Sequence, residues 1–195
     1  IALEEREIVS QELSHRIKNI FAVIAGLIQF SGRARPEVAA AATDLRERVT
    51  ALGRAHDFIR PRAAARQDAA PLDSLHGLLG QLFAPYQFAG RTRITVSGGE
   101  VAIDDRAATP IALLFHELAT NATKYGALSN DTGLVTVSWT LDGDGKRLKL
   151  RWQEEGGPPV TAPSRKGFGL RLVEHGLGRE LSGVVSLDFA PGGLV

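Results

Sequence analysis

Residues 12–27, "ELSHRIKNIFAVIAGL", decide the fold of the N-terminal part of the chain. Apolar side chains recur in this stretch at the spacing of one helical face, which predicts an amphipathic helix that packs against a partner. His15 points away from that face, because each helical residue turns by about 100°. An exposed imidazole is therefore expected. The apolar face consists of Leu13, Ile17, Ile20, Ile24 and Leu27, and Phe21 and Ile28 widen it.

A second helix follows at a short distance. The stretch "SGRARP", residues 31–36, predicts a break, since Gly32 is a poor helix residue and Pro36 restricts the residue before it. Beyond the break, a second apolar stripe runs from Val38 to Ile59 in alternating steps of four and three. Two such helices form an antiparallel hairpin, which needs a further partner, either a second copy or the rest of the chain.

The stretch "PRAAARQDAAP", residues 61–71, carries no apolar stripe and has proline at both ends, as linkers do. We therefore expect a helical hairpin over residues 1–62, a linker over 63–71 and a second domain over 72–195. The second domain mixes helical and strand periods, which predicts an α+β fold with a two-layer α/β sandwich. Helices are expected near 72–83, 105–126 and 168–181, strands at 93–98, 100–104 and 184–189, and a β-hairpin over 133–155 that turns at Asp142–Gly145.

Composition narrows the class of protein. A chain of 195 residues with 44% apolar and 23% charged residues can bury a core, and a net charge of +1 argues against binding to nucleic acid. The absence of cysteine excludes disulfides, thiol catalysis and Cys-ligated zinc. No membrane-spanning stretch or signal peptide is recognisable, so we expect a cytoplasmic protein. Because the chain starts at Ile1 and contains no Met, we expect it to be a fragment.

Candidate chemistry gathers in "FHELATNATKYGALS", residues 115–129. Glu117 and Asn121 share a helix face, with Lys124 close by. Together they could hold a divalent cation through the amide, offer a base and present a cation to phosphate, although an ordinary polar helix face has the same spacing. A zinc site is disfavoured, because Thr120 stands where the HExxH pattern needs its second histidine. His15 likewise is either a nucleophile or a plain surface histidine.

A third cluster combines "WQEEGGPPV", residues 152–160, with "RKGFGLRL", residues 165–172. Glu154 ends a strand just before two glycines, and Gly167 and Gly169 precede a predicted helix whose free N–H groups could receive phosphate. A lone GxG pattern is more typical of an ordinary loop, so this cluster by itself does not define a nucleotide site.

Taken in order, the motifs resemble those of the HWE histidine kinases, a branch of the two-component sensor kinases. "ELSHRIKNIFAVIAGL" is similar to the phosphoacceptor box, "HELATNATKYGALS" to the N box, "WQEEGGPPV" to the Trp-x-Glu motif and "GFGLRLVE" to the second glycine box. The resemblance implies a hairpin of the dimerisation and phosphoacceptor type. It also implies an ATP-binding sandwich of the Bergerat type found in GHKL ATPases, with the last strand truncated.

The resemblance also implies a role for individual residues. His15 is the phosphorylated residue, Asn121 holds the Mg²⁺ that bridges the ATP phosphates, and Glu117 polarises the attack or the metal shell. Glu154 accepts a hydrogen bond from the adenine amino group. The remaining implied positions are Lys124 near the phosphates, Gly156 beside the base, Gly167, Gly169 and Leu170 in the phosphate-side loop, and His116 and Trp152 as the family signature with no role beyond position.

The implied activity is autophosphorylation of His15 by ATP, followed by transfer to an aspartate of a response-regulator receiver domain. The implied partners are that receiver, an N-terminal sensor domain outside this chain and a second copy that could pair through the hairpin. Two other functions stay open. One is a phosphatase or adaptor that docks a receiver without turning over ATP, and the other is a GHKL-type ATPase in which His15 has no role.

Overall fold

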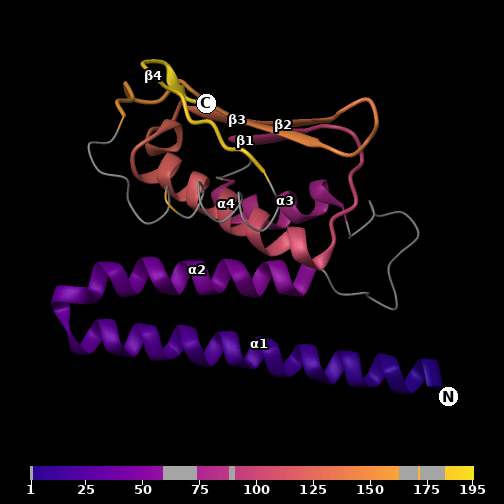
Figure 1. Ribbon diagram of the computed structural model, residues 1–195. Helices are drawn as coiled ribbons and strands as arrows, with labels where there is room; N and C mark the ends of the chain where they lie inside the picture. The colour runs from indigo at the N-terminus through magenta and orange to yellow at the C-terminus, as the bar shows by residue number, and fades with distance from the viewer. Residues whose placement is uncertain (1, 59–73, 88–90, 163–170, 172–182) are drawn as a thin grey trace.

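The computed structural model describes residues 2–58, 74–87, 91–162, 171 and 183–195. A helical hairpin of α1 and α2 lies along a layered unit in which α3 and α4 cover one face of a sheet (Figure 1). Helix α2 lies between α1 on one side and α3 and α4 on the other (Figure 1). Within these ranges, no helix combines the length and the apolar character needed to cross a lipid bilayer.

The hairpin consists of α1 (Ala2–Ala34), a single 3-10 turn η1 (Pro36–Val38) and α2 (Ala39–Phe58). The antiparallel pairing is as predicted, but the break is not at Gly32, because α1 continues through it. A Cβ at Gly32 would lie 2.6 Å from the Ala42 Cβ, so this glycine allows the two helices to approach closely. Pro36 ends the helix instead, with Arg35 in an extended conformation (φ −137°, ψ 92°).

The apolar stripe of α1 splits into two faces. Ile17, Phe21 and Ile28 are partly covered on the side of α2, and Phe21 packs beside Gly53. Leu13, Ile20 and Leu27 remain 57%, 55% and 62% exposed on a second face. A single neighbouring helix covers only part of the circumference of α1, so part of the predicted apolar face stays exposed.

The layered unit holds the remaining elements. Ser74 caps α3 by accepting a hydrogen bond from the Gly77 N–H, and Asp104 caps α4 in the same way from Ala107. Strands β1 and β2 are parallel, β2 and β3 are antiparallel, and β4 pairs with β5. The elements are α3 (Leu75–Phe83), η2 (Ala84–Tyr86), β1 (Ile94–Ser97), α4 (Asp105–Lys124), η3 (Ala127–Ser129), β2 (Leu134–Leu141), β3 (Leu148–Glu155), β4 (Phe189–Ala190) and β5 (Gly193–Leu194).

Two predicted strands are wrong in extent. Residues 100–104 form no strand: Ala102 makes an isolated bridge with Ser74, and Asp104 is committed to capping α4. The strand predicted at 184–189 is reduced to β4. The β-hairpin is confirmed, and its turn is held by the Asp142 carboxylate, which accepts the N–H groups of Lys146 and Arg147. The linker, the domain boundary within 61–71 and, apart from residue 171, the helix predicted at 168–181 lie outside the described residues.

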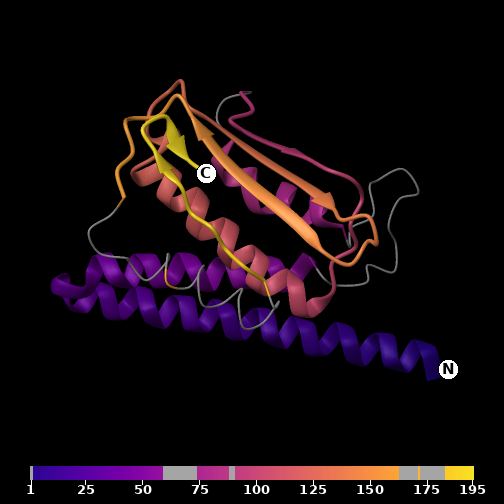
Figure 2. The ribbon, with the colours of Figure 1, turned by 45° about the horizontal axis from the view of Figure 1, so that its top comes forward.

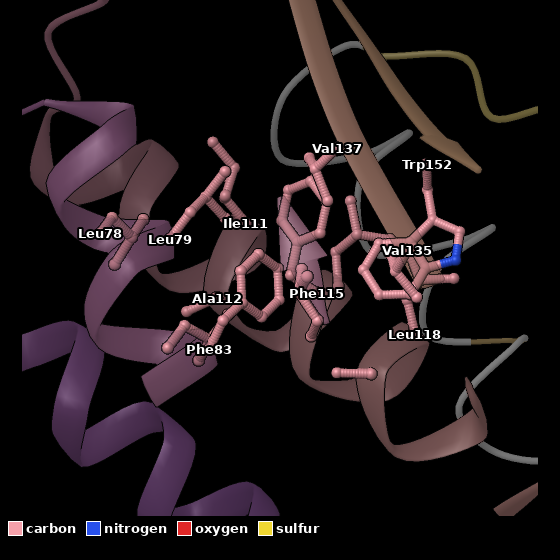
Figure 3. Packing of buried hydrophobic residues seen from close by; sticks show 14 of the residues in the cluster. Leu78, Leu79, Phe83, Ile111, Ala112, Phe115, Leu118, Val135, Val137 and Trp152 are labelled. Atoms are coloured by element: carbon pink, nitrogen blue, oxygen red, sulfur yellow. The ribbon is translucent and has the colours of Figure 1, made fainter. Parts of the chain in front are cut away.

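The hydrophobic core fills the space between the two helices and the sheet (Figure 3). Phe83 of α3 packs edge to face against Phe115 of α4, and Leu78 and Leu79 of α3 belong to the same cluster. Both helices face the strand that carries Val135 and Val137, β2 (Figure 3). The turned view shows α3 and α4 on the same face of the sheet (Figure 2). This arrangement confirms the predicted two-layer α/β sandwich after an N-terminal helical hairpin.

Candidate functional site

Helix α4 carries the first cluster of candidate residues and is held between two neighbours. Its apolar side packs into the core through Phe115, Leu118 and Ala122, which are at most 5% exposed. Its polar side meets α2. On α2, the facing residues are Asp44, Arg48, Ala51 and Ala55, whose spacing places them on one face, and both alanines are 1% exposed. The small alanines let the two helices approach closely.

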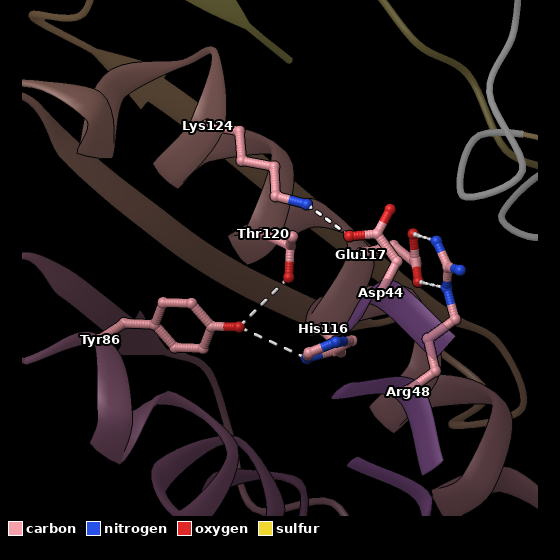
Figure 4. A network of polar contacts seen from close by, with 7 residues as sticks. All are labelled: Asp44, Arg48, Tyr86, His116, Glu117, Thr120 and Lys124. Atoms are coloured by element: carbon pink, nitrogen blue, oxygen red, sulfur yellow. Dashed lines mark hydrogen bonds and ion pairs between the residues drawn. The ribbon is translucent and has the colours of Figure 1, made fainter. Parts of the chain in front are cut away.

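Glu117 is bound by the hairpin. Arg48 donates from Nε to Oε1 at 2.5 Å and from a terminal nitrogen to Oε2 at 3.1 Å, so the guanidinium holds both carboxylate oxygens (Figure 4). Glu117 is only 4% exposed, which makes this a desolvated, two-point ion pair. The hydrogen bond to Glu117 raises the pKa of Arg48. The predicted base is therefore neutralised by a cation from the other part of the chain.

Lys124 makes a second, more exposed contact with the hairpin. Its Nζ lies 2.8 Å from Oδ1 of Asp44, and both side chains are 41% exposed (Figure 4). The hydrogen bond to Asp44 raises the pKa of Lys124. Asn121 lies on α4 between Glu117 and Lys124 and is half-buried. In the described part of the chain, no other group is hydrogen-bonded to the Asn121 side-chain amide, so its oxygen remains available to a cation.

His116 faces away from this contact and toward the segment after α3. The Tyr86 hydroxyl lies 3.4 Å from His116 Nδ1 and 3.3 Å from the Thr120 hydroxyl oxygen (Figure 4). Burial lowers the pKa of His116 and raises that of Tyr86, so both groups are neutral near pH 7. His116 thus fixes α4 against η2, which is a role in packing that its sequence position alone did not indicate.

Glu154 is buried on β3 and is held from two directions. Its Oε1 accepts from the Trp152 indole N–H at 3.0 Å, and its Oε2 accepts from the Ala127 backbone N–H at 2.8 Å. Glu154 is 3% exposed and Trp152 is 7% exposed. Gly126 is required beside them, because a Cβ there would overlap Oε2 of Glu154. The carboxylate therefore joins the end of α4 to the sheet.

His15 lies on the exposed surface of α1, as predicted. Gly32 of α1 lies beside Ala42 of α2, and Phe21 lies beside Gly53. In this antiparallel register, a residue of α1 lies opposite the residue of α2 for which the two numbers sum to 74. Arg48, which binds Glu117, therefore lies opposite Gly26 of α1. Gly26 is eleven residues, or about 16 Å along the helix, from His15. Helix α2 also lies between His15 and Glu117 (Figure 1). The structure does not bring the two predicted catalytic residues together.

Gly156 of the third cluster lies within the described residues. Gly156 has a left-handed backbone (φ +71°), and its carbonyl accepts from the Asn130 side chain at 2.9 Å. Such a backbone strongly favours glycine. Gly167, Gly169 and Leu170 lie outside the described residues.

No pattern in the sequence indicated which residues bind the side chains of α4. Asp44 and Arg48 occupy α2 four residues apart, which on its own is typical of any exposed helix. Tyr86 stands next to a proline in a short connection, and the Ala127 N–H is a backbone group. Only the packing of α2 against α4 showed that Arg48 contacts Glu117 and that Asp44 contacts Lys124.

Two comparisons of sequence bear on the family. A family profile described as HWE histidine kinase matches residues 12–100. A blue-light-activated histidine kinase of Brucella anthropi is 37% identical over 193 residues, and that of Brucella ovis is 34% identical over 192 residues. These alignments cover 98% and 97% of this chain. The chain belongs to the HWE histidine kinase family. It spans 38% of the length of each of these relatives.

The fold agrees with that of solved histidine kinases. The histidine kinase domain of a blue-light-activated histidine kinase from Erythrobacter litoralis superimposes with a TM-score of 0.58 at 24% identity, over 98% of this chain and 89% of that one. A longer structure of that protein gives a TM-score of 0.63 at 21% identity, over 94% of this chain and 56% of its own. At this level of identity the likeness concerns the fold, which is the hairpin followed by the Bergerat-type sandwich.

In this member of the HWE family, the signature residues now have physical partners. His116 is bound to Tyr86, and Trp152 donates to Glu154. A buried carboxylate has about four acceptor positions, and the described contacts use two of them. Glu154 therefore retains acceptor capacity for the amino group of a base, and Asn121 retains an oxygen for Mg²⁺. The residues present fit the ATP and Mg²⁺ that the family implies.

Proposed function

We propose that this chain is the catalytic core of a sensor histidine kinase, which transfers the γ-phosphoryl group of ATP to His15 and then to an aspartate of a receiver domain. The observation that carries this proposal is the exposed imidazole of His15, which shares α1 with two apolar faces but belongs to neither. A histidine that served packing would lie on one of those faces. An exposed imidazole can act as a nucleophile.

The nucleotide is held by residues at the end of α4 and β3. Asn121 binds Mg²⁺ through its amide oxygen, Glu154 accepts from the adenine amino group, and the left-handed Gly156 lets the base approach. When bound, Mg²⁺ neutralises charge on the phosphates. Gly167, Gly169 and Leu170 complete the phosphate side, as the family motif implies.

The arrangement described above precedes phosphoryl transfer. Glu117 lies about 16 Å along the hairpin from His15, and both of its oxygens are bound to Arg48. Transfer requires the sandwich to leave this position. Glu117 then separates from Arg48, Lys124 separates from Asp44, and both become available to the reacting groups. A division into a hairpin over 1–62, a linker over 63–71 and an ATP-binding domain over 72–195 allows such a movement.

The exposed face of α1 fits a helical partner. Leu13, Ile20 and Leu27 are spaced by seven residues, which is the spacing of a coiled-coil seam. Because the sandwich covers α2, this face is left for a second copy of the hairpin or for the helix of an N-terminal sensor domain. Measuring the mass of the chain in solution by light scattering, with Ile20→Glu as the variant that disrupts the seam, separates a dimer from a monomer.

The central experiment is incubation of the chain with labelled ATP and Mg²⁺, followed by addition of candidate receiver domains. We expect acid-labile, base-stable phosphate on the wild type and none on His15→Ala, with ATP affinity unchanged. Persistent labelling of His15→Ala would overturn the choice of nucleophile. ATP turnover without any labelled protein would favour the GHKL ATPase, and receiver binding without nucleotide binding would favour the phosphatase or adaptor.

A further inference from the structure

The contact between Trp152 and Glu154 restricts the orientation of a buried carboxylate. The two residues alternate with outward-facing neighbours on β3, so both side chains point into the core. The indole N–H donates to Oε1 at 3.0 Å, while the Ala127 N–H donates to Oε2 from the far side. A glutamate side chain has three rotatable bonds, and two donors on different oxygens restrict it to one orientation.

The indole that makes this contact is itself fixed. Its ring packs against Phe83 and Phe115, each with a centroid separation of 6.1 Å (Figure 3). Those two rings meet edge to face at 5.9 Å and belong to α3 and α4. The position of the indole nitrogen is therefore set by the core of the sandwich, and that nitrogen sets the position of one carboxylate oxygen.

We propose that Trp152 is a positioning residue for base recognition, which acts by holding the Glu154 carboxylate in the orientation that accepts from an adenine amino group. This inference rests on the proposed nucleotide-binding function of Glu154. Without the indole N–H, Oε1 loses its donor. The carboxylate then keeps only the hydrogen bond from the Ala127 N–H and can rotate about it. A rotated carboxylate still carries its charge, but it no longer presents an acceptor that distinguishes the amino group of adenine from the carbonyl of guanine.

The chain supplies a matched control in its only other tryptophan, Trp139. Trp139 is 3% exposed on the neighbouring strand β2, and its indole N–H donates to the Gly99 carbonyl at 2.8 Å. Both Trp152→Phe and Trp139→Phe therefore remove one buried indole hydrogen bond and leave an aromatic ring. They differ in that only the first touches Glu154.

The test is equilibrium binding of Mg·ATP and Mg·GTP to the wild type and to both variants, with thermal unfolding measured alongside. We expect Trp152→Phe to lower the ratio of ATP to GTP affinity by roughly tenfold, as the loss of a hydrogen bond to a charged acceptor implies. Trp139→Phe should lower the unfolding temperature comparably and leave the ratio unchanged. A folded Trp152→Phe with the wild-type ratio would overturn the inference, and so would an equal loss of the ratio in both variants.

A second measurement covers the case in which Trp152→Phe does not fold. Trp139→Phe leaves Trp152 as the single tryptophan, so its fluorescence reports directly on the contact with Glu154. We expect ATP to shift this emission and GTP to shift it much less at equal occupancy. Bound ATP with no change in emission would contradict a role for Trp152. A wild type that binds neither nucleotide would instead refute the proposed function, which keeps the two failures distinct.

Discussion

The ion pair between Arg48 and Glu117 allows a quantitative prediction about how the hairpin holds the sandwich. The substitution Arg48→Met removes the guanidinium but keeps most of the aliphatic stem, and it leaves the Glu117 carboxylate buried without its partner. Removing one member of a fully buried pair costs about 3–5 kcal/mol. Because the Arg48 side chain is 19% exposed and that of Glu117 only 5%, some water can replace the lost contact, and we expect about 2–3 kcal/mol.

This loss is measurable by urea unfolding followed by circular dichroism. With a slope of about 2 kcal/mol per molar urea, the midpoint should fall by about 1–1.5 M. Arg46→Met makes the same change two residues earlier on α2, outside this ion pair, and controls for the altered helix. Lys124→Met breaks the exposed pair with Asp44, and we expect it to cost less than about 1 kcal/mol.

A double-mutant cycle tests the reasoning directly. If Arg48 and Glu117 stabilise each other, the combination of Arg48→Met and Glu117→Gln should cost about 2 kcal/mol less than the two single effects together. A coupling below about 0.5 kcal/mol, or an Arg48→Met midpoint equal to that of Arg46→Met, would refute the assignment of this pair as the main polar contact between the two parts. Under the proposed function, Arg48→Met also frees Glu117 and raises the initial rate of His15 labelling.

Three further predictions concern the α4 end of the sandwich. Asn121→Ala should abolish the Mg²⁺-dependent part of ATP binding, and an affinity that still rises with Mg²⁺ in calorimetry would contradict its role as a ligand. Because burial lowers the pKa of His116, the unfolded chain binds more protons below about pH 6.5, and stability should fall on acidification through that value. The effect should be smaller in His116→Asn, and equal slopes in denaturation series from pH 7.5 to 5.5 would exclude it. Gly126→Ala should destabilise the fold by about 1–3 kcal/mol through overlap with Glu154, whereas Gly143→Ala, which points into open space, should change the unfolding midpoint little.

Local patterns determined the elements and the exposure of His15. The period of apolar residues predicted α1 and α2, and the Asp142–Gly145 turn predicted the hairpin of β2 and β3, because these features depend on neighbours within a few residues. The direction of His15 followed from helical geometry in the same way. At Gly32 the sequence was misleading. The low helix propensity of glycine predicted a break, but the sequence cannot show that Ala42 lies against that glycine.

The sequence by itself therefore indicated which side chains are candidates for chemistry, and the tertiary structure decided what each one contacts. Glu117 is bound to Arg48, 69 residues away, and Glu154 to the Ala127 N–H, 27 residues away, and no short-range pattern encodes either pair. Such contacts arise because the core fixes α4 between α2 and the sheet, and burial then requires each carboxylate to find a donor from whatever element lies opposite. For that reason the motifs named the candidate site, but only the fold showed that Arg48 of the hairpin binds Glu117 and that the Trp152 indole donates a hydrogen bond to Glu154.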